Sequence, residues 1–150
     1  MNLEIPAPLR AEHEELHARL LKATQEPGAV GEAAREVARL LHPHFVREEA
    51  FALPPLALLA QITRSAGVRP EMAEVLPMTR QLEAELPAML AEHAEIVRAL
   101  DRLRTAARMA NQSEHERFAE ALVLHAQTEE LVLYPAAILI GRHVAQSLGV

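Results

Sequence analysis

Apolar residues recur at steps of three and four in four long stretches of this chain, the spacing that places them on one face of an α-helix. No alternating pattern typical of a β-strand competes with this spacing. The predicted helices cover about residues 8–26, 32–54, 87–110 and 113–135. A turn is expected at Asn111-Gln112, and Ser113-x-x-Glu116 matches a capping-box pattern at the start of the last helix. Because two of the three connections are short, the sequence predicts an all-α fold, an antiparallel up-down-up-down four-helix bundle.

The segment between the second and third predicted helices, residues 55–86, is less regular than the rest. We expect a short helix from Leu56 to Ser65, a break at Ala66-Gly67, and further helix from Pro70 to Leu86. Another short helix is expected at the C-terminus. The chain is therefore interpreted as a single domain over residues 1–150 with extra short helices in this connection.

Two pairs of segments repeat each other along the chain. AEHEEL in the first predicted helix resembles AEHAEI in the third, and the second and fourth helices share the pattern H-x3-E-E-x4-P. The segments with this shared pattern are HFVREEAFALP, residues 44–54, and HAQTEELVLYP, residues 125–135. The repeat predicts two helical hairpins of one pattern, at about 8–54 and 87–135, packed about a pseudo-twofold axis.

Four histidines each lie on the apolar face of their own predicted helix, where a polar side chain is unexpected. Two glutamates lie on the same faces, each one helical turn after its histidine. These candidate residues are His13, His44 with Glu48, His93, and His125 with Glu129.

Taken singly, each of these histidines is equally well explained as a solvated residue at the edge of the face or as a core imidazole bonded to a carbonyl. These explanations do not account for the histidines together with the two glutamates, because a buried carboxylate must be paired, protonated or bound to a metal. No Lys or Arg lies near Glu48 or Glu129 on these faces. The four imidazoles and two carboxylates therefore predict a metal site.

Two cations fit this set of side chains better than one. Six side chains exceed the four ligands of a tetrahedral zinc site, and each glutamate can bridge two ions. Iron, manganese and zinc all suit imidazole and carboxylate donors. An incomplete ligand shell would leave a position for a small external ligand such as O2, NO or peroxide.

These motifs resemble those of the hemerythrin-like, or HHE cation-binding, family, and the resemblance covers nearly the whole chain. His44-Phe45 followed by Glu48 is similar to the H-F-x-x-E motif of that family, and HAQTEELVLYP is similar to its H-x-x-x-E-E…P motif. The resemblance implies a four-helix bundle with two bridged irons. The iron ligands that it implies are His13, His44, His93 and His125, with Glu48 as one bridge.

The resemblance also implies a carboxylate of the fourth helix as the second bridge, and the sequence leaves two candidates for it. The aspartate of oxygen-carrying hemerythrins falls on Glu130 here, whereas the repeat and the helical phase favour Glu129, which we prefer. Those hemerythrins also have His-x-x-x-His on the third helix, but Met89 and Val97 flank His93 at that spacing. This difference argues against simple reversible O2 carriage and favours sensing, iron handling or oxidation.

Other chemistry-bearing residues have weaker patterns. His17 is interpreted as an auxiliary residue, and His42, His115 and His143 as solvated surface residues. The single tyrosine, Tyr134, is interpreted as a packing residue at a helix end. Directly before His44, Pro43 indicates either a kink or a new helix start.

The overall composition narrows the classes of function. A net charge of −6 and a pI near 5.7 provide no basic surface for nucleic acid. The absence of cysteine excludes disulfides and suits a reducing compartment. No signal-peptide pattern is present, and the longest apolar runs are short and broken by proline. We therefore expect a soluble, cytoplasmic protein with no nucleic-acid or membrane partner.

Two alternatives to a diiron protein remain at this stage. One is a single zinc or iron ion that stabilises the bundle without a redox role. The other is a helical interaction domain with a vestigial site, as a homodimer that buries the Leu-rich segment 53–62. Since no nucleophile–base pattern or phosphate-binding loop is present, a protein that binds metal and small ligands is favoured over an enzyme.

Overall fold

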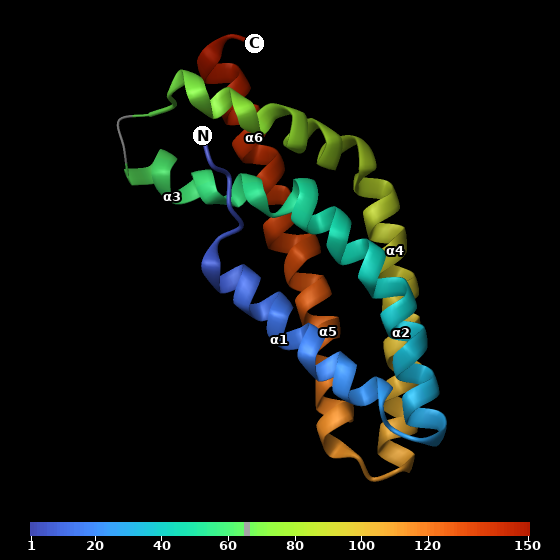
Figure 1. The fold of residues 1–150 in the computed structure, drawn as a ribbon. Coiled ribbons are helices and arrows are strands. Elements are labelled where there is room, and N and C mark those ends of the chain that lie inside the picture. The colour runs from blue at the N-terminus through green and yellow to red at the C-terminus, as the bar shows by residue number, and fades with distance from the viewer. Residues whose placement is uncertain (65–66) are drawn as a thin grey trace.

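The computed structural model describes residues 1–64 and 67–150, and every regular element in these ranges is helical (Figure 1). The helices of the bundle are α1 (Ala7–Thr24), α2 (Gly28–Arg47), α4 (Leu76–Met109) and α5 (Ser113–Thr128). The shorter elements are α3 (Ala57–Arg64), α6 (Tyr134–Leu148) and the turns η1 (Glu48–Ala52), η2 (Pro54–Leu56), η3 (Pro70–Val75) and η4 (Glu129–Leu133). The predicted all-α fold with four main helices is confirmed.

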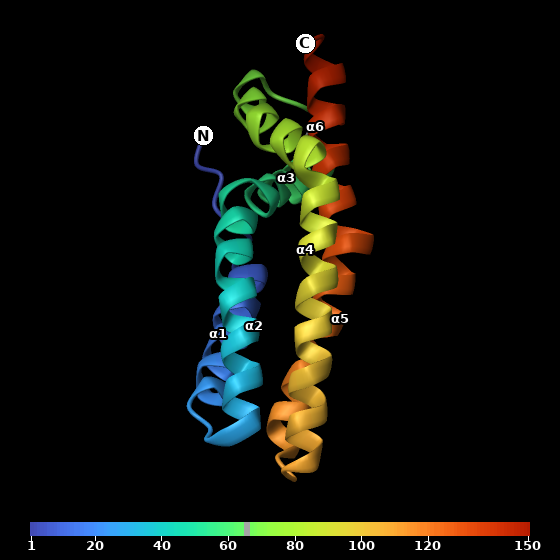
Figure 2. The ribbon, with the colours of Figure 1, turned by 90° about the vertical axis from the view of Figure 1, so that its right-hand side faces the viewer.

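The four main helices form a closed ring of contacts. α1 contacts α2 and α5, and α4 contacts the same two helices. Figures 1 and 2 show α2 returning beside α1 and α5 returning beside α4, so that the chain forms two hairpins lying against each other. Every main helix therefore contributes a face to one shared interior.

The third long helix differs from its prediction at its start. α4 begins at Leu76 rather than near Pro87 and continues through that proline. A proline inside a helix removes one backbone hydrogen bond and clashes with the carbonyl four residues earlier, so it bends the helix. Figure 1 shows α4 bending between its green and yellow portions. In α2, Pro43 likewise lies inside a continuous helix and does not start a new one.

The connection contains short helices, as predicted. α3 ends at Arg64, and the expected last residue of this helix, Ser65, and part of the expected break, Ala66, lie outside the described residues. At the C-terminus, α6 follows η4 directly at Tyr134 and is a continuation of the fourth helix rather than a separate one.

The predicted capping box at Ser113 is wrong. Gln112 is the N-cap residue and Ser113 is already helical, with no side-chain hydrogen bond to the helix end. Arg117 instead donates to the Ser113 hydroxyl at 3.4 Å. The predicted turn at Asn111-Gln112 is present, and Asn111 has a positive φ of 54°, which asparagine tolerates better than most residues.

The two segments with the repeated H-x3-E-E-x4-P pattern share a second feature, a π-helical turn. The backbone N–H of Leu53 donates to the carbonyl of Glu48, and that of Tyr134 donates to the carbonyl of Glu129. Each turn is followed closely by a proline, which cannot donate a backbone hydrogen bond. A π turn widens the helix locally and changes the direction of the side chains beyond it.

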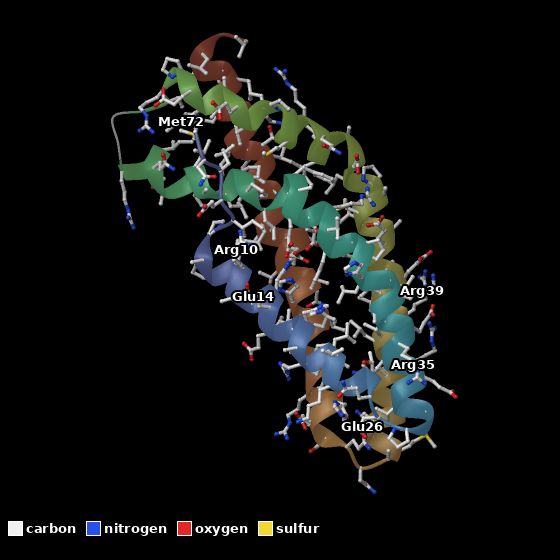
Figure 3. The ribbon with its side chains drawn as sticks, viewed as in Figure 1. Arg10, Glu14, Glu26, Arg35, Arg39 and Met72 are labelled. Atoms are coloured by element: carbon white, nitrogen blue, oxygen red, sulfur yellow. The ribbon has the colours of Figure 1, made fainter. Side chains whose placement is uncertain are left out.

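The interior has two apolar clusters along the bundle. One cluster includes Leu20, Val37, Leu100 and Phe118, and the other is built around η1, α3, the first half of α4, and α6. Charged residues such as Arg35 and Arg39 project from the outer side of α2 (Figure 3). The change from one cluster to the other falls close to the histidines and glutamates of the repeated motifs, as Met89 and Ile96 show on either side of His93, so apolar packing lies at both ends of this region.

The Leu-rich segment 53–62 packs within the chain itself. Leu53, Leu56 and Leu58 are buried in the same apolar cluster as α6, and only Leu59 is exposed among its leucines. The chain itself therefore already covers these three leucines.

The continuous helical segment Ser113–Leu148 is apolar along much of its length, with a mean hydropathy of 1.3 in its most apolar window. By length and composition alone it is long enough to cross a membrane, which differs from the expectation that no segment meets this criterion. A core helix meets the same criterion, and this one contributes His125 and Glu129 to the interior of the bundle.

The contact between α4 and α6 depends on Gly141. A Cβ atom at Gly141 would lie 2.1 Å from Oγ1 and 2.5 Å from Cβ of Thr79. We expect Gly141→Ala to lower the free energy of unfolding by about 1–3 kcal/mol through overpacking, against a helix-propensity gain of at most about 1 kcal/mol. Urea unfolding measures the change, with Ser147→Ala on the exposed side of α6 as the control. A more stable Gly141→Ala protein would contradict this close packing.

Candidate metal centre

Glu48 and Glu129 lie at the middle of the bundle, at the first residue of each π turn, and are 0% and 1% exposed. Around them are two groups of four buried residues whose ligand atoms all lie within 4.8 Å of one another. Both groups contain the two glutamates. The first adds His13 and His125, and the second adds His44 and His93.

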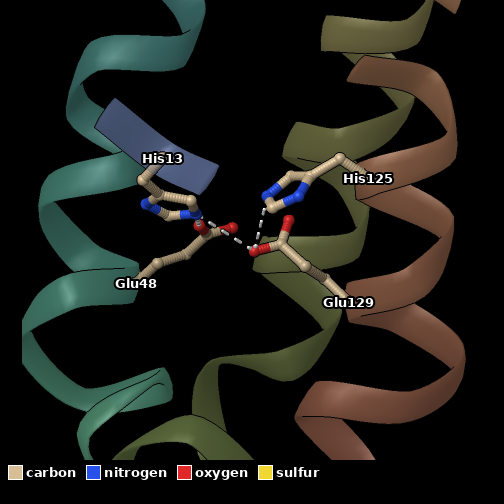
Figure 4. A group of neighbouring side chains, drawn as sticks. All are labelled: His13, Glu48, His125 and Glu129. Atoms are coloured by element: carbon tan, nitrogen blue, oxygen red, sulfur yellow. Dashed lines mark ion pairs between the residues drawn. The ribbon is translucent and has the colours of Figure 1, made fainter. Parts of the chain in front are cut away.

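The first group is drawn in Figure 4, where imidazole and carboxylate atoms point toward a common centre. His13 Nε2 lies 3.3 Å from Glu48 Oε2 and 3.7 Å from Glu129 Oε2, and His125 Nε2 lies 3.4 Å from Glu129 Oε2. None of these four atoms has a hydrogen-bond partner, although all are buried. Buried polar atoms without partners are rare, and each calls for an explanation. A cation between them would satisfy all four at once.

The second group is more tightly connected. His44 Nε2 lies 2.6 Å from Glu48 Oε1, and His93 Nε2 lies 3.5 Å from the same oxygen and 3.4 Å from Glu129 Oε1. The hydroxyl of Tyr134 donates to Glu48 Oε1 at 2.5 Å. The imidazole nitrogens of this group therefore face two carboxylates and a phenol.

The opposite ring nitrogen of each histidine faces a carboxylate farther from the centre. His44 Nδ1 lies 2.6 Å from Glu92, and His125 Nδ1 lies 2.6 Å from Glu12. The corresponding contacts of the other two histidines are His13 Nδ1 to Glu49 at 3.3 Å and His93 Nδ1 to Glu130 at 3.0 Å. Carboxylates in this position orient an imidazole so that Nε2 points to a metal. We refer to Glu12, Glu49, Glu92 and Glu130 as the outer carboxylates.

The outer carboxylates are sequence neighbours of the inner residues. In each E-E pair the first glutamate points to the centre and the second contacts a histidine, as Glu129 and Glu130 show. Glu129 contacts His13, His93 and His125 through its inward oxygens, whereas Glu130 belongs to neither group and contacts the outward Nδ1 of His93. The structure thus separates these adjacent carboxylates into one inner and one outer residue.

The buried carboxylates change the pKa values of the histidines in the metal-free protein. Burial disfavours the charged imidazolium, but the hydrogen bonds and charges of Glu129 and Glu48 outweigh it and raise the pKa of His93 to about 10. Burial is likewise outweighed by Glu129 and Glu12 at His125, whose pKa rises to about 9. Burial of Glu129 is offset by its contacts with the histidines, which hold its pKa well below the usual range.

His115 was assigned incorrectly from the sequence, and Tyr134, interpreted as a packing residue, lies on a face that the helical phase alone would not predict. His115 is buried and its Nε2 lies 3.1 Å from Glu26, so it is not a surface residue. Tyr134 is fully buried beside the second group. It lies nine residues after His125, and a regular α-helix, with about 100° per residue, would place it on the opposite face from His125. The π turn between them redirects it. The proline after each E-E pair was the only signal of that turn in the sequence.

Four helices around two buried groups of imidazoles and carboxylates define a cation-binding helical protein. The hemerythrin HHE cation-binding domain matches residues 5–137 of the chain. The chain therefore belongs to the hemerythrin HHE cation-binding family. Comparisons with curated proteins and with solved structures produced no match.

The stability of the metal-free protein should depend on pH above neutrality. A histidine whose pKa is raised on folding adds stability that is complete below its unfolded pKa of about 6.5 and disappears as the pH rises through its folded pKa. For His93 and His125 these folded values are about 10 and 9. We expect the melting temperature in the presence of a chelator to fall between pH 7 and pH 10. A constant melting temperature over this range would contradict the raised values.

The outer carboxylates should affect metal affinity without contacting the metal. We expect Glu12→Gln to weaken metal binding about 10–100-fold, because His125 loses the charged partner that orients its ring. Competition with a coloured chelator measures the affinity. Glu15→Gln, on an exposed position of the same helix, is the matched control and should bind metal as the wild type does. Equal affinities of the two variants would exclude an orienting role for Glu12.

Proposed function

We propose that this chain is a non-haem diiron protein of the hemerythrin type, built as an up-down-up-down bundle of two repeated hairpins. The observation that carries this proposal is the pair of overlapping four-residue groups that share Glu48 and Glu129. In this arrangement His13 and His125 would hold one iron, His44 and His93 would hold the other, and Glu48 and Glu129, which belong to both groups, would serve both irons. The first-group atoms that lack hydrogen-bond partners support the assignment.

The donor set suits iron because it combines imidazole and carboxylate without thiolate. Iron with histidine and carboxylate ligands and an open position supplies binding and redox chemistry toward O2, NO or peroxide. The residues of this chain contribute an interior that excludes water, oriented imidazoles, and two negative charges that offset the positive charge of the cations. Sensing of such a small molecule, or the handling of iron, is the function that we propose, and the lack of cysteine fits the cytoplasm as its location.

A single structural zinc or iron ion is the second candidate. It is favoured by one observation, that the buried inward atoms without partners all belong to the first group, whereas Tyr134 already contacts the second. A single ion would raise the melting temperature by mass action but would not respond to O2 or NO.

The diiron and single-ion candidates predict different metal contents when a residue that belongs to both groups, or to only one of them, is replaced. We expect about two irons per chain after anaerobic reconstitution. Glu48→Gln should lose both, because both groups contain Glu48, whereas His125→Ala should lose one. Metal analysis after gel filtration measures the content, and Glu120→Gln on the exposed side of α5 is the control. NO added to the reduced protein should change its visible and electron paramagnetic resonance spectra.

One ion in the wild type, with no response to NO, would select the structural candidate. Wild-type iron content in both His44→Ala and Glu48→Gln would show that the metal lies elsewhere, and the proposed centre would then be wrong.

A further inference from the structure

Tyr134 is the only tyrosine of the chain, and its side chain is completely buried at the start of α6. Its hydroxyl lies 2.5 Å from Glu48 Oε1, 3.2 Å from His93 Nε2 and 3.4 Å from His44 Nε2. These three atoms belong to the second group, which also contains Glu129. The phenol oxygen therefore lies among the inward atoms of this group rather than behind them.

The distances match those between neighbouring ligands of one cation. Nitrogen and oxygen donors that bind a metal at about 2.0–2.2 Å lie about 3 Å from one another in an octahedral shell. Within the second group, the separations are 2.6 Å from His44 Nε2 to Glu48 Oε1 and 3.4 Å from His93 Nε2 to Glu129 Oε1. The phenol oxygen, at 2.5–3.4 Å from three of these atoms, occupies the place of a fifth donor.

The first group has no such donor. The residue that corresponds to Tyr134 in the other repeat is Leu53, which is buried but has no polar atom in its side chain. On α4, Met89 and Val97 lie one turn before and after His93, so this helix supplies a single histidine. The phenol thus makes the two otherwise similar groups unequal, with five donors in one and four in the other.

A pocket of about 290 Å³ lies on the side of the first group. Its lining includes His13 and Phe45, whose rings stack with their centroids 4.0 Å apart. Tyr134 does not line this pocket. The group with fewer donors is therefore the one whose histidine borders a pocket.

We propose that Tyr134 is a protein ligand of the cation held by His44 and His93, bound through its phenolate oxygen. The proposal rests on the proposed diiron function. The proton of the phenol leaves to solvent when the cation binds, as protons leave other ligands on metal binding. No electron transfer is involved in this step.

The test uses the full chain loaded with Fe2+ without oxygen and then oxidised to Fe3+ with ferricyanide. A phenolate bound to Fe3+ absorbs visible light by charge transfer and gives ring vibrations in the resonance Raman spectrum, which imidazole and carboxylate ligands do not. Because the chain has one tyrosine, these signals in the wild type can come only from Tyr134. The metal-free and zinc-loaded wild type are the spectral controls.

We expect the wild type to hold two irons and show both signals. Tyr134→Phe, which keeps the ring and its packing, should lose both signals and bind one of its two irons at least about tenfold more weakly. The wild-type spectrum decides the question even where the variant fails to fold.

The remaining outcomes separate this proposal from the diiron function. Two irons in the wild type without phenolate signals would show that the phenol only donates a hydrogen bond to Glu48, and the diiron function would stand. One iron in the wild type and two in Tyr134→Phe would show that the hydroxyl occupies the place of the second cation. This result would overturn both the ligand role of Tyr134 and the diiron function. Absence of iron binding by the wild type would overturn the function itself, and the ligand role with it.

Discussion

Glu48 and Glu129 bring two carboxylates into the middle of the bundle, where neither is accessible to water. Such a burial costs several kcal/mol per ion unless opposite charge compensates it. Among residues 1–64 and 67–150, no Lys or Arg forms an ion pair with either carboxylate, whereas four histidines do. The interior is therefore stable only with positive charge in it, carried by protons on the imidazoles or by cations between them.

Protons and cations compete for the same place in this centre. The carboxylates that raise the pKa values of His93 and His125 also attract a cation, and a metal ion binds imidazole only in its neutral form. The outer carboxylates lie beside Nδ1 of each histidine, on the side away from the centre. They keep Nε2 directed inward, so the centre is organised before a metal arrives.

The inner residues could be identified from the sequence because their signal is local and occurs twice. His44 and Glu48 lie on an apolar helical face, and the same spacing recurs at His125 and Glu129. The structure brings these four residues together with His13 and His93. A periodicity of 3.6 residues depends only on the neighbouring turns of one helix, so the sequence contains it in full.

The outer carboxylates, Tyr134 and the extent of α4 could not be identified in this way. Glu12 contacts a histidine of α5 and Glu92 contacts one of α2, so each role depends on which helix lies opposite. Tyr134 reaches the centre only because a π turn changes the phase of the helix before it. The helix through Pro87 persists because a proline bends a long helix without ending it when the packing around both halves favours it.

The sequence by itself thus determined the helical class, the four main helices and the inner histidines and glutamates, since each follows from short-range periodicity and a repeated motif. Only the tertiary structure decided which histidines share a group, that Glu129 faces inward while Glu130 faces His93, and that one phenol distinguishes the two groups. The physical reason is that these outcomes depend on contacts between segments far apart in the chain. Two π turns set the phase in which those segments meet.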